Sequence, residues 1–132
     1  MGYTRYWNNA PKIHKDAPWK AFVEDFKKLK ETLPDDIEIR DKSTDLQVYF
    51  NGVGKEAHET FCIKKVNQGD GFDFCKTARK SYDTLVAATL LIYKHHFPQI
   101  ELSADGSNGD DGAMLIATAL PYGVELLTEM AI

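Results

Sequence analysis

One stretch of the sequence decides the fold, and it reads Phe74-Cys75-Lys76-Thr77-Ala78-Arg79-Lys80-Ser81-Tyr82-Asp83-Thr84-Leu85-Val86-Ala87-Ala88-Thr89-Leu90-Leu91-Ile92-Tyr93-Lys94-His95-His96. Apolar side chains recur along it at helical spacing, and in its second half they cover most of the helix circumference. Asp73 is a good N-cap residue, and Pro98 ends the pattern. We therefore predict one long helix over Phe74–His96 whose C-terminal half is buried.

The residues before this helix alternate between strand and helix patterns. Period-2 and β-prone segments predict four strands, and one segment with apolar residues at helical spacing predicts a helix that Pro34 stops. In chain order these are strand 2–7, helix 16–33, and strands 37–40, 46–50 and 58–66. Asn51-Gly52-Val53-Gly54 supplies residues that tolerate positive φ, which favours a hairpin between the last two strands.

The residues after the long helix give weaker patterns. We expect a short strand at 99–103 and a polar loop at 104–112, in which Asp110 caps the following helix at 113–120. A final strand is predicted at 124–128, although the pattern there fits a helix equally well. The chain 1–132 thus reads as a single α+β domain. Its antiparallel or mixed sheet has about five or six strands, with two to three helices packed on one face.

Composition limits the functions that the chain can have. Charged residues make up 27% and the formal net charge is −4, so nucleic acid and anionic membranes are disfavoured and any cationic site must be local. Cys62 and Cys75 lack the spacing of a zinc or disulfide framework. No apolar run is long enough to cross a membrane, and no signal peptide is indicated, which predicts a cytoplasmic protein.

The beginning of the predicted long helix is the most informative local feature. Lys76, Arg79 and Lys80 fall on one side of it, and Thr77 adds a hydroxyl near its start. Free N–H groups at a helix start favour an anion, whereas three cations there oppose the dipole and call for a reason. A phosphate or carboxylate site is one interpretation; a solvated helix face with an Arg79–Asp83 pair is the other.

Three aromatic residues, Tyr3, Tyr6 and Trp7, lie in the first predicted strand. Aromatic faces beside cations can hold a nucleobase, so these residues are candidates for ligand stacking. An aromatic strand is more often part of a core, and Trp7 in particular could fill the space beneath the first helix.

Cys75, His58 and Glu59 are the candidate catalytic residues. Cys75 would sit at a helix start near cations, where the pKa of a thiol falls, but it needs a base that the sequence does not place. His58-Glu59-Thr60 fits the H-x-T element that two-histidine phosphodiesterases carry twice, and this chain has one copy. A structural role, with His58 at a groove rim, is the favoured interpretation.

Neither a metal nor a cofactor is predicted. His95 and His96 at a helix end are explained by the C-terminal dipole, and Asp105, Asp110 and Asp111 lack the EF-hand spacing. Gly52-Val53-Gly54-Lys55 lacks the P-loop spacing and is interpreted as a turn.

Four groups of residues together resemble a family of small uncharacterised proteins scattered through bacterial and phage genomes. They are Gly2-Tyr3-Thr4 with Tyr6-Trp7, His58-Glu59-Thr60-Phe61, Phe74-Cys75-Lys76-Thr77-Ala78-Arg79-Lys80 with Tyr82-Asp83, and Lys94-His95-His96. Ser81 stands where the resemblance leads us to expect Pro. The resemblance brings no activity with it; it implies a phage or mobile-element origin.

Three functional hypotheses follow. The first is a binding module without enzymatic activity, in which Lys76, Thr77, Arg79 and Lys80 hold a phosphorylated ligand such as a nucleotide and the aromatic strand stacks on its base; a phage could use it against host defence by sequestering a host signal. The second is a hydrolase or transferase centred on Cys75 or His58. The third is a module that inhibits a host protein in the bacterial cytoplasm. The sequence does not decide whether the chain forms a homo-oligomer.

Overall fold

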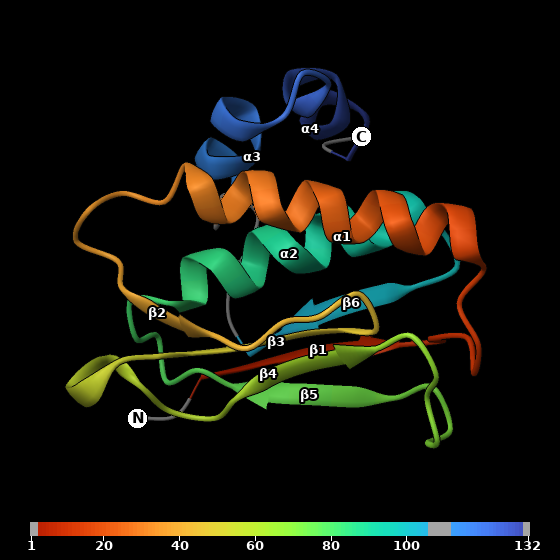
Figure 1. Cartoon of the computed structure of the whole chain (residues 1–132), viewed down its shortest axis with the longest axis horizontal. Helices are drawn as coiled ribbons and strands as arrows, with labels where there is room; N and C mark the ends of the chain where they lie inside the picture. The colour runs from red at the N-terminus through yellow and green to blue at the C-terminus, as the bar shows by residue number, and fades with distance from the viewer. Residues whose placement is uncertain (1–2, 106–111, 131–132) are drawn as a thin grey trace.

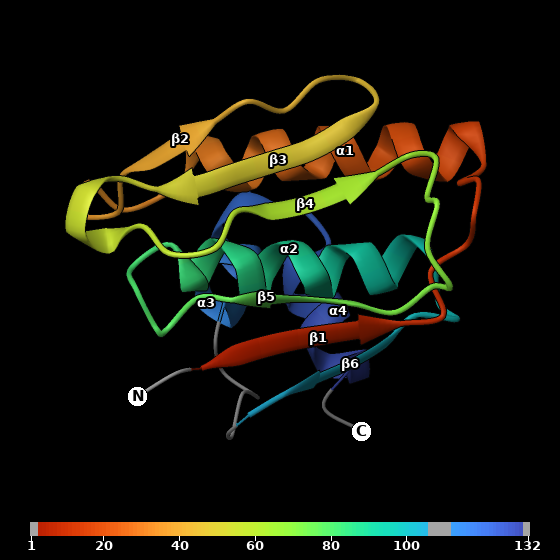
Figure 2. The same ribbon diagram turned by 90° about the horizontal axis from the view of Figure 1, so that it is seen from below.

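Six strands form two antiparallel sheets in the computed structural model of the chain, which describes residues 3–105 and 112–130. The strand order is β5 (Asp73–Lys76), β1 (Thr4–Asn8), β6 (Glu101–Ala104) in one sheet and β2 (Ile39–Asp41), β3 (Gln47–Gly52), β4 (Phe61–Lys64) in the other. Figure 2 shows the two sheets side by side, with β4 next to β5. The strand layer therefore has one face toward the helices and one outer face.

Side-chain alternation sets which residues face the helices. In β3, Val48 and Phe50 are buried, whereas Tyr49 and Asn51, which alternate with them, are only partly covered. The period-2 pattern predicted this strand, and the register pairs Val48 with Ile63. The alternation places Tyr49 and Asn51 on the outer face.

The helices all lie on the other side of the strand layer (Figure 1). They are α1 (Asp16–Glu31), α2 (Asp83–His96), α3 (Ala113–Ala119) and α4 (Gly123–Met130). α1 and α2 cover the strands directly, and α3 and α4 lie beyond them (Figure 1). The expected α+β class with helices on one face is confirmed. None of the described helices is both long and apolar enough to span a membrane.

The predicted beginning of the long helix is wrong. Residues Asp73–Lys76 form strand β5, which pairs with β1 through Tyr6 opposite Phe74 and Arg5 opposite Cys75. Ala78 and Arg79 then adopt positive φ values of 53° and 55°, which no α-helix accommodates. The helix begins at Asp83. Asp73 is therefore a strand residue and not an N-cap.

The segment 124–128 is part of helix α4 and not a strand, and Gly123 is its first residue. Asp16 is the first residue of α1; the N-cap position belongs to Lys15, and the Asp16 carboxylate pairs with the Lys65 ammonium. The expected cap at Asp110 lies outside the described residues.

Candidate functional site

Asn51 organises one end of the outer face, where β3 ends and the chain returns toward β4. Its Oδ1 accepts hydrogen bonds from the backbone N–H groups of Gly52 at 2.7 Å and His58 at 3.1 Å. Its Nδ2 donates to the His58 carbonyl at 3.0 Å and to Oγ1 of Thr60 at 3.2 Å. Because both ends of this amide are used, Asn51 holds the returning loop in place.

Two glycines make this return tight enough. A Cβ at Gly52 would lie 1.9 Å from the Glu56 carbonyl oxygen, so no larger residue fits there. Gly54 has φ +59°, in the left-handed region that glycine adopts at little cost, and begins the 3₁₀ turn η1 (Gly54–Glu56). After this turn, His58 and Thr60 lie beside the Asn51 side chain.

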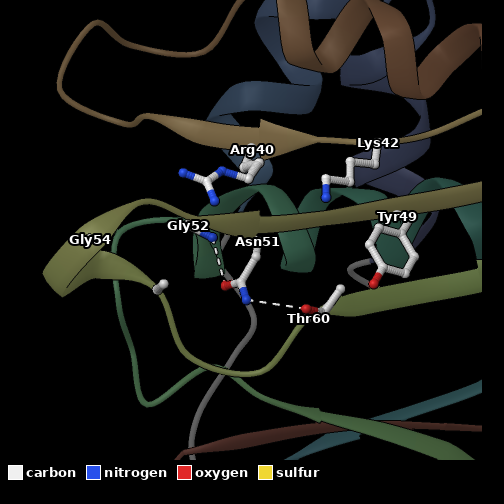
Figure 3. A pocket seen from close by; sticks show the side chains of 8 residues that line it. Arg40, Lys42, Tyr49, Asn51, Gly52, Gly54 and Thr60 are labelled. Atoms are coloured by element: carbon white, nitrogen blue, oxygen red, sulfur yellow. Dashed lines mark hydrogen bonds between the residues drawn. The ribbon is translucent and has the colours of Figure 1, made fainter.

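A pocket of about 270 Å³ lies where this loop meets β2 and β3. Its lining is mostly polar and comprises Arg40, Lys42, Tyr49, Asn51, Gly52, Gly54, Ala57 and Thr60. Figure 3 shows Arg40 on β2 and Lys42 just after it, with Tyr49 and Asn51 on β3 and Thr60 just before β4. Strand pairing explains the meeting, since Arg40 lies opposite Asn51 in the register. We call this the cationic pocket.

The cationic pocket has an uncompensated positive charge. Among the described residues, neither Arg40 nor Lys42 has a carboxylate within ion-pair distance. Tyr49 and Thr60 add hydroxyl groups, and the Thr60 oxygen already accepts a hydrogen bond from Asn51, which leaves its proton to donate. Two cations and two hydroxyls around one small space are suited to bind an anion with several oxygens.

Glu59 and Glu56 connect this loop to the turn between β5 and α2. Glu59 accepts a hydrogen bond at Oε1 from the backbone N–H of Lys76 at 2.9 Å, and its own N–H donates to the Lys76 carbonyl at 3.1 Å. Oε1 of Glu56 accepts from the N–H of Ser81 at 2.8 Å. Glu59 thus connects the loop before β4 in one sheet to the end of β5 in the other sheet.

The four residues predicted to bind an anion do not share a helix face. Lys76 ends β5 and Thr77 is buried, where its hydroxyl donates to Oδ1 of Asp83 at 2.6 Å. The Arg79 guanidinium lies 4.0 Å from the centre of the Tyr3 ring, and Lys80 follows in the turn. The geometry brings Tyr3, Thr77 and Arg79 together, but the helix start that was expected to bind the anion is not there.

The predicted aromatic set is divided between two faces of the sheet. Tyr3 and Trp7 are buried on the helix side, and Trp7 packs against Phe61 with ring centres 5.3 Å apart. Tyr6 lies on the outer face next to Phe72 and Phe74. Tyr6 therefore faces away from Tyr3 and Trp7.

The geometry around Cys75 differs from that of a nucleophile. Cys75 is fully buried in β5, and burial together with the nearby Glu59 raises the pKa of its thiol to about 12. Its Sγ lies 3.5 Å from the Glu59 carbonyl oxygen. His58 is exposed in the loop before β4, so it is not the strand residue that the sequence predicted.

The two histidines at the end of α2 have protein partners. His96 Nε2 lies 2.7 Å from Oδ2 of Asp25, which also accepts a hydrogen bond from the Tyr122 hydroxyl. The His95 ring stacks on Tyr122 with centres 4.8 Å apart. These contacts connect α1, α2 and the residues before α4. Asp110 and Asp111 lie outside the described residues, whereas Asp105 accepts hydrogen bonds from Thr4 and Tyr6.

The sequence did not point to Arg40, Lys42 or Tyr49 as site residues. The available signal was the alternation of side chains along extended segments. Arg40 and Lys42 are two positions apart, as are Tyr49 and Asn51, so the two side chains of each pair are expected to face the same side. Comparison of the chain with protein-family models, with curated proteins and with solved structures finds no match. Function must therefore be argued from the site itself.

Proposed function

We propose that the protein binds a small phosphorylated ligand, such as a nucleotide, in the cationic pocket. The observation that carries this proposal is the pair Arg40 and Lys42, which face one polar pocket without acidic partners among the described residues. A guanidinium binds two phosphate oxygens at once, and an ammonium adds a point charge beside it.

The small volume of the cationic pocket and the net negative charge of the protein favour a small ligand over a nucleic acid. The pocket volume of about 270 Å³ lies just below the usual range of ligand pockets, which begins at roughly 300 Å³. The net charge of −4 opposes a long polyanion elsewhere on the surface. Binding and sequestering a phosphorylated signal of a bacterial host would suit a phage-encoded protein of this kind.

Titration calorimetry with adenosine monophosphate, ribose 5-phosphate and adenosine tests the proposal. We expect the two phosphorylated compounds to bind and adenosine not to bind, because the phosphate makes the charged contacts. The double variant R40A/K42A removes two charge-assisted contacts and should weaken binding at least about 100-fold. The matched control K12A/K20A removes two exposed lysines elsewhere and should leave the affinity unchanged.

Two results would refute this assignment. One is equal affinity for adenosine and adenosine monophosphate, since the phosphate would then contribute nothing. The other is an R40A/K42A variant that folds and still binds as the unaltered protein does.

A further inference from the structure

Three aromatic rings gather on the outer face of the β5-β1-β6 sheet, away from the cationic pocket. The ring centres of Tyr6, Phe72 and Phe74 lie 6.2 to 6.4 Å from one another. Phe72 is 49% exposed and Phe74 is 43% exposed. We call these three residues the aromatic patch. Large aromatic side chains grouped at the surface are typical of a binding surface.

Each residue of the aromatic patch is hydrogen-bonded to a carboxylate. Asp70 Oδ1 accepts from the N–H of Phe72 at 3.1 Å, and Asp73 Oδ1 accepts from the N–H of Phe74 at 2.8 Å. The Tyr6 hydroxyl donates to Oδ1 of Asp105 at 2.7 Å.

These three carboxylates have only neutral partners. Among the described residues, none of Asp70, Asp73 and Asp105 forms an ion pair. Three carboxylates without an ion-pair partner among the described residues therefore lie beside the aromatic patch. That combination selects against anionic lipids and nucleic acids, which the carboxylates repel. It selects for cations, because carboxylates attract them and aromatic ring faces do as well.

We propose that the aromatic patch docks a basic segment of a partner protein, with apolar side chains against the rings and Arg or Lys side chains at the three carboxylates. Charge complementarity carries this assignment, and the apolar rings require a partner that is more than a soluble cation. The inference does not depend on ligand binding in the cationic pocket, which lies in the other sheet.

Fluorescence anisotropy with labelled synthetic peptides tests the proposal. The probe alternates Arg and Leu, and two control peptides alternate Glu with Leu and Arg with Ser. We expect the Arg-Leu peptide to bind more tightly than either control. The variant F72S/F74S should weaken it at least about 10-fold by removing the apolar contact. The variant D70N/D73N keeps the hydrogen-bond acceptors, removes two charges, and should weaken it about 3- to 10-fold.

The matched control is D35N/D36N, which removes two exposed carboxylates elsewhere and should not change peptide affinity. The proposal is overturned if the Arg-Leu peptide does not bind, if it binds F72S/F74S as well as the unaltered protein, or if the Glu-Leu peptide binds equally. Self-association of the purified protein that F72S/F74S abolishes would also overturn it, since the patch would then belong to a second copy of the chain.

Discussion

Arg5 and Asp83 bury an ion pair between β1 and the first residue of α2. Both contacts, from Nε to Oδ1 and from Nη2 to Oδ2, measure 2.8 Å, and the two side chains are 4% and 10% exposed. Thr77 donates a further hydrogen bond to the same carboxylate. Charges this deeply buried need an opposite charge with well-aligned hydrogen bonds, and the Arg5–Asp83 pair supplies both.

Asp83→Asn should therefore destabilise the protein strongly. The substitution removes the carboxylate that pairs with the buried Arg5 guanidinium, which costs about 3 kcal/mol or more of unfolding free energy. Urea denaturation of the two proteins measures the difference. The exposed pair Lys27–Glu24 provides a matched control, and Glu24→Gln should cost less than about 0.5 kcal/mol. A loss below about 1 kcal/mol for Asp83→Asn would contradict this view of the pair.

At the scale of the elements, His14 joins three segments of the chain. It is buried, with Nδ1 2.7 Å from the Lys65 carbonyl oxygen and Nε2 2.6 Å from the Tyr93 hydroxyl. The carbonyl can only accept, so Nδ1 carries the proton and Nε2 accepts from Tyr93. This arrangement connects the β1–α1 segment, the β4–β5 segment and α2 through one neutral imidazole.

Burial lowers the pKa of His14 from its usual 6.5, and this predicts a loss of stability in mild acid. Below pH 6.5 the unfolded chain binds a proton that the folded chain excludes, so this contribution is complete above pH 6.5 and falls as the pH falls. Between pH 6.5 and 5.5 the loss reaches at most about 1.4 kcal/mol. Urea denaturation at pH 7.0 and 5.5 should show a larger decrease than in His14→Gln. An NMR titration that places the His14 pKa above 6.5 would refute this.

The beginning of α2 shows where sequence patterns stop being sufficient. Phe74, Ala78 and Tyr82 have helical spacing, yet residues 73–76 pair with β1 and the helix begins only at Asp83. The buried partner of Asp83 is Arg5, which is far away in the sequence, so no local pattern could place that boundary. The strands with strict alternation, such as β3, were predicted correctly because one face of each is buried.

The candidate site was missed for a related reason. Asn51-Gly52-Val53-Gly54 was correctly predicted to lead from one strand of a hairpin to the next, but the pattern does not show which side chains the hairpin brings together. Arg40 meets Asn51 only through the β2–β3 register, which the sequence does not specify. Lys76, Arg79 and Lys80 were predicted as the site because three cations near an expected helix start oppose the helix dipole. An Arg and a Lys in an exposed extended segment give no comparable signal.

On the scale of the whole molecule, the outer face of the strand layer has two regions of opposite character. The cationic pocket lies on the β2-β3-β4 sheet, and the aromatic patch with its carboxylates lies on the β5-β1-β6 sheet. All described helices lie behind this face (Figure 1). The two proposed binding sites therefore lie on one face of the molecule, each on a different sheet.

The most direct test of ligand binding in the cationic pocket is an NMR titration of the ¹⁵N-labelled protein with adenosine monophosphate. The account predicts amide shift changes that saturate with ligand and centre on Arg40, Asn51, Gly52, Gly54 and Thr60. The same spectra monitor the turn at Lys76–Lys80, where little change is expected. Shift changes centred on that turn, or a protein whose spectrum does not respond to the nucleotide, would contradict the account.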